Sequence, residues 1–196
     1  MKVIAIHGNY GANDKNFLPQ VSILPDSAIL FSNRPFFVPE FAAQFIAHTS
    51  LVVRIDRLGK SVAKRFAPRY YNAVAAGITV EARNVKCYDA AGAAPCALAT
   101  SFDGSVMLGD FIPVDELESR QPVVSTFFNG EVVDTLYTSQ LTMGIDELIE
   151  HVSRFFTLKT GDLIFTGHTS TEPELVTGTR LTAKVDDRDS LLIRVK

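Results

Sequence analysis

Residues 123–137 read VVSTFFNGEVVDTLY and carry the clearest fold signal in the chain. Two arms rich in β-branched and aromatic residues flank Asn129-Gly130, and the dihedral tolerance of this pair suits the type I′ turn of a two-residue hairpin. We therefore predict a β-hairpin centred on Asn129-Gly130, and the rest of the chain is interpreted outward from it.

The segment that follows the hairpin predicts the longest helix. Residues 144–156 place apolar side chains at helical spacing, and Asp146 and Glu147 put negative charge in the first turn, where it interacts favourably with the helix dipole. The remaining residues read as three strands, 162–166, 180–185 and 191–195, the last two joined by the charged turn DDRDS.

Short apolar and β-branched runs upstream of the hairpin predict further strands. They cover residues 2–6, 27–31, 35–38, 50–57, 73–82 and 105–114, with a helical turn or two at 63–71 and weak helical character at 85–92. Strands outnumber helices about two to one without a βαβ rhythm, which favours an α+β, mainly β fold. Because no linker or repeat interrupts the chain, we expect a single domain over residues 1–196.

The composition is that of a soluble globular protein. The chain has 196 residues, of which 46% are hydrophobic, with 14 Phe and no Trp. A net charge of -3 argues against nucleic-acid binding, because neutralising phosphates needs a basic face.

The N-terminal sequence MKVIAIHGNYG argues against a targeting or membrane segment. Its apolar run ends at His7 and is too short for a signal peptide or a membrane span, so we expect a cytoplasmic protein with no membrane partner. Cys87 and Cys96 lack a partnering motif and are interpreted as free thiols.

Seven ordered segments resemble the fumarylacetoacetate hydrolase family, small bacterial enzymes that hydrolyse, decarboxylate or isomerise acylpyruvates and related 2-oxo acids. They are IHGNY (6–10), PDSAIL (25–30), VVRIDRLGKSVAKRF (52–66), GITVEARNV (77–85), SFDGSVMLGDFIP (101–113), NGEVVDTLYTS (129–139) and SRFFTLKTGDLIFTG (153–167). The resemblance implies curved mixed sheets with a few short helices and the longer helix at about 144–156. It also implies a homodimer, a lid loop over about residues 10–22, and a pocket for Mg²⁺.

The resemblance also shows which metal ligands are missing. Family members hold Mg²⁺ with a Glu-x-Glu pair on one strand and an Asp on its neighbour, and the ion polarises the ketone of a 2-oxo acid. In this sequence those three positions carry His48, Ser50 and Thr79. Three crowded carboxylates repel one another without a cation, so neutral residues at all three positions are mutually consistent.

The family's catalytic positions are replaced as well. The His and Glu that activate water in the family correspond to Asn13 and Asn16, and the Lys before Gly-Phe-Asp corresponds to Thr100. We therefore predict no catalytic residues of the family type and no Mg²⁺. The chain is expected to have lost the Mg²⁺-dependent hydrolase or isomerase activity and to retain binding of a small organic acid.

Two other functions remain open from the sequence. One is an active hydrolase, isomerase or decarboxylase on a 2-oxo acid of the acylpyruvate type, with an altered mechanism or with Zn²⁺ bound through His48, since His7 and His168 also map beside the pocket. The other is a non-catalytic subunit that acts through dimerisation or another protein interaction.

Polar residues that map beside the family pocket are candidates for lining it. They are His7, Asn9, Tyr10, His48, Ser50, Thr79, Arg83, Asp103, His168 and Thr169. Arg83 suits a carboxylate anchor because its guanidinium fork matches a carboxylate, although a structural ion pair is the alternative. For Asp103 and Glu81 a surface or structural role is the expectation.

Overall fold

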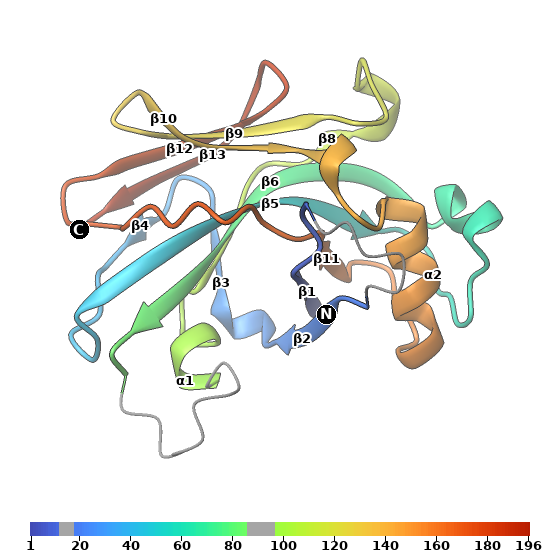
Figure 1. Ribbon diagram of the computed structural model, residues 1–196, viewed down its shortest axis with the longest axis horizontal. Coiled ribbons are helices and arrows are strands. Elements are labelled where there is room, and N and C mark those ends of the chain that lie inside the picture. Colours follow the sequence, from blue (N-terminus) through green and yellow to red (C-terminus); the bar gives the residue numbers. More distant parts are fainter. Residues whose placement is uncertain (12–17, 86–96) are drawn as a thin grey trace.

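A computed structural model describes residues 1–11, 18–85 and 97–196 (Figure 1). The replaced catalytic positions Asn13 and Asn16 lie outside the described residues, as do Cys87, Cys96 and most of the predicted helical stretch at 85–92. No helix in the described ranges is long and apolar enough to cross a membrane.

Two β-sheets form the body of the molecule (Figure 1). Among the described residues, the first has eight strands: β2 (Gln20–Leu24), β1 (Val3–His7), β11 (Leu163–Phe165), β5 (Gln44–Ile55), β6 (Tyr71–Arg83), β7 (Val106–Leu108) and β3 (Ile29–Phe31) in spatial order, with β8 (Ile112–Pro113) also paired to β6. The second has five: β10 (Glu131–Tyr137), β9 (Val123–Phe128), β12 (Arg180–Val185), β13 (Arg188–Val195) and β4 (Pro35–Phe36).

Helices are few in the described part of the chain. They are α1 (Ala97–Thr100), α2 (Ile145–Phe155) and four 3₁₀ helices, Asp26–Ala28, Lys64–Arg69, Val114–Glu116 and Thr138–Gln140. Parallel pairs (β1 with β11, β3 with β7, β13 with β4) occur beside antiparallel ones, so the sheets are mixed. The predicted α+β, mainly β fold is confirmed.

The long strands β5 and β6 form the centre of the larger sheet. They pair antiparallel from Gln44 opposite Arg83 to Ile55 opposite Tyr71. Both faces of β5 are buried along most of its length. This explains why its sequence does not show the polar and apolar alternation of a half-exposed strand.

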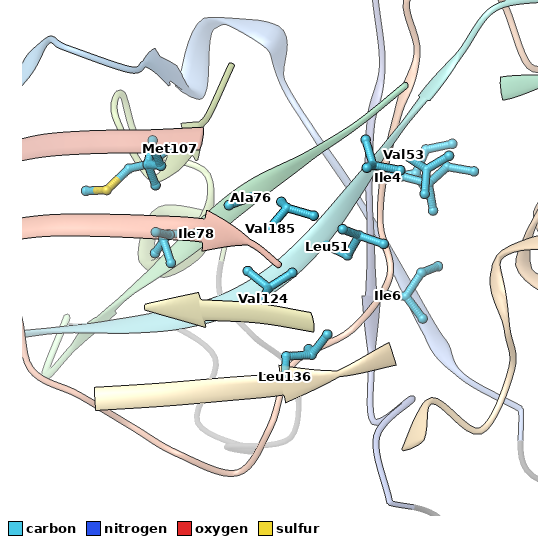
Figure 2. Packing of buried hydrophobic residues seen from close by; sticks show 14 of the residues in the cluster. Ile4, Ile6, Leu51, Val53, Ala76, Ile78, Met107, Val124, Leu136 and Val185 are labelled. Carbon is cyan, nitrogen blue, oxygen red and sulfur yellow. The ribbon is translucent and has the colours of Figure 1, made fainter. Parts of the chain in front are cut away.

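The main core lies between the two sheets. Leu51 of β5 points toward the smaller sheet, where Val124, Leu136 and Val185 gather near it, and Val53 on the same face lies beside Ile4 (Figure 2). A second apolar cluster, which includes Val3, Ala5, Val52, Ala75 and Phe165, covers the opposite face of the larger sheet. A fully buried Leu or Val side chain contributes roughly 1.5–3 kcal/mol to the free energy of unfolding. The main core therefore holds the two sheets together, and the second cluster stabilises the larger sheet from its other side.

The predicted hairpin and helix are confirmed. Asn129 and Gly130 both have positive φ, 52° and 93°, as a type I′ turn requires. Helix α2 begins after Gly144, whose backbone N–H donates to the Glu147 carboxylate at 3.0 Å. Its buried face, with Leu148, Ile149 and Val152, packs into the main core.

Several strand boundaries differ from the prediction because partner strands set them. The strand expected at 50–57 begins at Gln44, since residues 44–49 continue to pair with β6. The last strand begins at Arg188 rather than Leu191, because Asp186 and Asp187 alone form the turn. Ser27 and Ala28 belong to a 3₁₀ helix and not to a strand.

Two longer predictions are also corrected. Residues 105–114 form β7 and β8 rather than one strand. At the break the Gly109 N–H donates to the Ala76 carbonyl at 3.0 Å, and a Cβ on Gly109 would lie 2.7 Å from that oxygen. In the predicted lid at 10–22, residues 20–22 lie in β2 and pair with β1, so this part is sheet.

Candidate functional site

The three family ligand positions lie side by side on the outer face of the larger sheet, which points away from the smaller sheet. His48 on β5 stands directly opposite Thr79 on β6, and Ser50 stands opposite Gly77. His48 and Ser50 are two residues apart, so their side chains share a face with Thr79 and with Glu81, two residues further along β6. The pairing of β5 with β6 therefore places side by side the three positions that correspond to the family's metal ligands.

Three histidines from separate parts of the chain also meet at this face. The ring centroids of His48 and His168 are 4.3 Å apart, and those of His7 and His168 are 6.1 Å apart. The topology explains the meeting: β1, β11 and β5 are neighbours in the sheet, His7 ends β1, and His168 follows β11 closely. We call His7, His48, His168 and Glu81 the histidine cluster.

Hydrogen bonds orient the imidazoles. His48 Nε2 lies 3.3 Å from a Glu81 carboxylate oxygen, and His7 Nε2 lies 3.0 Å from the Ser22 hydroxyl. His168 Nδ1 lies 2.8 Å from the Thr169 carbonyl. Because a carbonyl only accepts, the Nδ1 of His168 carries the proton, which leaves Nε2 as an acceptor in the neutral ring.

The buried surroundings keep two of these histidines neutral. Burial is the main cause that lowers the pKa of His7 and of His48 below the ordinary value, and the neighbouring His168 lowers both further. Glu81 acts in the opposite direction on each pKa. Near pH 7 both imidazoles are therefore proton acceptors, and His48 Nδ1 is buried without a hydrogen-bond partner among the described residues.

The donor set does not fit Mg²⁺, which prefers carboxylate and other oxygen ligands in an octahedral arrangement. None of the three ligand positions carries a carboxylate, and the Ser50 hydroxyl donates to the Leu51 carbonyl at 3.2 Å. The nearby Glu81 is hydrogen-bonded to His48. In the ranges that the structure describes, no group of three His, Cys, Asp or Glu side chains is arranged to hold a metal ion, including the three histidines proposed for Zn²⁺.

Two predicted pocket residues hold neighbouring loops together. Fully buried Asn9 donates to the carbonyls of Met143 and Thr166 at 2.9 and 2.8 Å and accepts from the Met143 N–H at 2.8 Å. The Tyr10 hydroxyl donates to the Gln140 side chain at 2.6 Å. Asn9 thus joins the loop after β1 to the segment before α2 and to the end of β11, and Tyr10 contacts the segment before α2.

The remaining predicted residues lie at or beyond the rim of the cluster. Arg83 forms an ion pair with Glu172, and this pair lowers the pKa of the Glu172 carboxyl. Asp103 is exposed in a turn, and Thr100 ends α1. The alternative of a structural ion pair therefore describes Arg83 in this structure.

The sequence analysis did not predict a buried polar network around Thr169, which follows His168 in the chain. The Thr169 hydroxyl donates to Asp134 Oδ1 at 2.8 Å and accepts from the Thr171 N–H at 3.1 Å. Asp134 is 5% exposed, and its other oxygen has no partner in the described part of the chain. Nearby, the Thr49 hydroxyl donates to Thr126 at 2.9 Å. A single Asp in a strand gave no signal of this contact, which joins residues 35 apart.

A model of the fumarylacetoacetate (FAA) hydrolase C-terminal domain matches residues 5–195. The chain belongs to the FAA hydrolase family. Among curated relatives, oxaloacetate tautomerase YcgM of Escherichia coli (strain K12) is 26% identical over 202 residues, covering 99% of this chain and 92% of that protein. The mitochondrial oxaloacetate tautomerase of Caenorhabditis elegans is 26% identical over 150 residues, covering 76% of this chain and 70% of that one.

Solved structures agree with the FAA hydrolase assignment. The 5-carboxymethyl-2-hydroxymuconate delta-isomerase of Mycobacterium smegmatis has a TM-score of 0.86 at 27% identity, covering 99% of this chain and 78% of that one. Fumarylpyruvate hydrolase of Pseudomonas aeruginosa, solved with Mn²⁺ and pyruvate, has a TM-score of 0.89 at 22% identity, covering 100% and 89%. The relatives are thus named as tautomerases, isomerases and hydrolases.

Proposed function

We propose that this FAA hydrolase family member has lost the family's Mg²⁺-dependent hydrolase or isomerase activity and uses the histidine cluster to bind a small organic acid. The observation that carries the proposal is the placement of His48, Ser50 and Thr79 side by side, where the resemblance puts three carboxylates. Neutral side chains there remove the mutual repulsion that a cation otherwise relieves.

The chemistry of the cluster favours an organic anion. A carboxylate placed against a buried neutral imidazole raises the imidazole pKa and becomes the acceptor of a charge-assisted hydrogen bond. Names of relatives point to the same class, since they include oxaloacetate tautomerases and a structure with pyruvate. We therefore infer a 2-oxo acid or a related carboxylic acid as the ligand, with a proton taken up on binding.

Imidazole nitrogen NMR tests the binding directly. Oxalate, pyruvate and oxaloacetate are added to the protein in the presence of a metal chelator, and the His48 and His168 signals should move toward the protonated form. His48→Gln should abolish the response, whereas His151→Gln, on α2 away from the cluster, should leave it unchanged. If none of the three acids shifts the imidazole nitrogen signals of His48 and His168 in the wild-type protein, the binding proposal is contradicted.

Turnover tests the loss of hydrolysis separately. Acylpyruvate cleavage is followed with Mg²⁺ or Mn²⁺ present, and we expect no rate above the metal alone. Metal-dependent cleavage that His48→Gln or Thr79→Val removes would overturn this part of the proposal.

A second candidate, favoured by the contact between His48 and Glu81, is metal-free keto–enol tautomerisation of a 2-oxo acid. A neutral imidazole can accept the proton from the carbon beside the ketone while a second group returns a proton to the carbonyl oxygen, so atoms and electrons balance without a co-reactant. Decay of enol oxaloacetate in the presence of a chelator measures this activity. A wild-type rate equal to that of His48→Gln would exclude it.

We also propose that the chain forms a homodimer and, if it lacks catalysis, can act through that assembly. The family resemblance supports this state. Light scattering after size-exclusion chromatography should give twice the chain mass of 21.5 kDa, and a monomer at working concentration contradicts it.

A further inference from the structure

A groove of about 640 Å³ lies on the smaller sheet, away from the histidine cluster. Strands β12 and β13, the Asn129-Gly130 turn and the Ser32-Asn33 loop form its walls. A smaller pocket of about 140 Å³ adjoins it, because Asn33 and Leu192 line both. The groove is in the size range of small-molecule sites, and the pocket has room for one compact group.

The small pocket is positively charged. Arg34, Arg194 and Lys196 line it, and no Asp or Glu does. Arg180, which lines the adjoining groove, stands directly opposite Arg194 in the β12–β13 pair. Leu181 and Ile193 beside them point into the core, so the two arginine side chains share the outer face with their Cβ atoms about 5 Å apart.

This arrangement is unfavourable for the protein alone. Like charges directly opposite on neighbouring strands destabilise a sheet. Within the described ranges, none of these four cations has a carboxylate within 4.0 Å. Cations at the other end of the same hairpin do have partners: Lys184 lies 3.5 Å from Asp189, and Arg188 lies 2.6 Å from Glu116.

The groove has the opposite polarity at its other side, where Asp110 and Asp189 line it. Asp110 and Asp189, which is 3.5 Å from Lys184 and keeps further acceptor sites, can both accept hydrogen bonds from a ligand. A fitting ligand is therefore anionic at one end and carries hydroxyl or amino donors at the other.

We propose that this groove binds a small phosphate monoester. The phosphoryl group lies among Arg34, Arg194 and Lys196, since guanidinium forks match phosphate oxygens with paired hydrogen bonds and three cations suit three terminal oxygens. The polar organic part lies in the groove toward Asp110. The bound dianion offsets the repulsion between Arg180 and Arg194, and the site is separate from the histidine cluster.

The probe is ribose 5-phosphate, followed by backbone amide NMR. Saturable shifts are expected at Asn33, Leu192 and Arg194, with none at the histidine cluster. Ribose alone and sodium chloride at matched ionic strength should not produce them. Equal shifts with sodium chloride, or shifts confined to the cluster, overturn the proposal.

Two arginines of the same strand provide a matched pair of variants. Arg194→Gln should weaken binding roughly tenfold or more, because a charge-assisted pair to phosphate is lost. Arg188→Gln, whose partner is Glu116, should bind as the wild type does. Without ligand, Arg194→Gln should melt at or above the wild-type temperature, because one repulsion is removed. Unchanged affinity in Arg194→Gln would refute the site, and a lowered melting temperature of the ligand-free variant would contradict the repulsion between Arg180 and Arg194.

Discussion

The inner face of β5 places the Thr49 hydroxyl against a partner inside the protein, whereas the outer face leaves one buried nitrogen of His48 without a partner among the described residues. The Thr49 hydroxyl, pointing inward, donates to Thr126 on the smaller sheet. The Thr169 hydroxyl donates to Asp134 on the smaller sheet, whose other oxygen has no partner among the described residues. On the outer face, His48 Nδ1 is buried without a partner among the described residues, and His48 Nε2 makes only a 3.3 Å contact with Glu81. A single strand thus has an inner face that packs against the smaller sheet and an outer face that carries His48, where we propose that the ligand binds.

The largest effect should come from the inner face. Leu51→Ala removes a fully buried side chain and should lower the free energy of unfolding by about 2–5 kcal/mol. Ser50→Ala, its neighbour on the outer face, removes only one hydrogen bond to the Leu51 carbonyl and should lower it by about 1 kcal/mol. Urea denaturation measures both. Equal losses for the two variants would show that the faces are not energetically distinct.

Restoring the family carboxylates tests whether His48, Ser50 and Thr79 occupy a site where three carboxylates would repel one another without a cation. The variant His48→Glu/Ser50→Glu/Thr79→Asp should unfold about 2 kcal/mol more easily without metal, because three carboxylates crowd one point. Mg²⁺ should reverse the loss. A variant that is as stable as the wild type without metal and indifferent to Mg²⁺ would show that these side chains do not converge.

Removing the Thr169 hydroxyl tests whether the buried hydrogen bond between Thr169 and Asp134 stabilises the fold. Thr169→Val leaves the Asp134 carboxylate with neither oxygen paired inside the protein and should cost about 1–3 kcal/mol. Thr171→Val, at an exposed position two residues away, should cost little. If Thr169→Val leaves the free energy of unfolding unchanged, water already donates hydrogen bonds to this carboxylate.

Lowering the pH should produce the smallest change in the free energy of unfolding, through His7 and His48 on the outer face of the larger sheet. The pKa values of His7 and His48 are lowered in the folded protein, so below the ordinary value of 6.5 the unfolded chain binds protons that the folded chain does not. The free energy of unfolding should therefore fall as the pH drops from 6.5 through the folded pKa values. In the variant His7→Gln/His48→Gln this loss should be smaller. If the variant and the wild type show the same pH dependence, groups other than His7 and His48 cause the loss of stability in acid.

Local signals predicted the elements that local chemistry determines. The Asn129-Gly130 turn and the helical spacing over 144–156 gave the hairpin and α2 with correct boundaries to within a residue. The start of β5 was not predictable locally, because Gln44 to Thr49 is held by β6 and carries no alternation.

The site was predictable only in part. The resemblance located His48, Ser50 and Thr79, but the meeting of the three histidines depends on β1, β11 and β5 being neighbours in the sheet. The contact of Glu81 with His48 depends in turn on the register of β5 and β6. Contacts such as Asp134 with Thr169 arise from side-chain packing across the core, which no sequence spacing records.

The most direct test of the central claim is a calorimetric titration of Mn²⁺ into the wild-type protein, with the variant that restores the three carboxylates as the matched control. We predict no saturable binding to the wild type and micromolar binding to the restored variant. Micromolar binding to the wild type, accompanied by turnover of an acylpyruvate, would contradict the account.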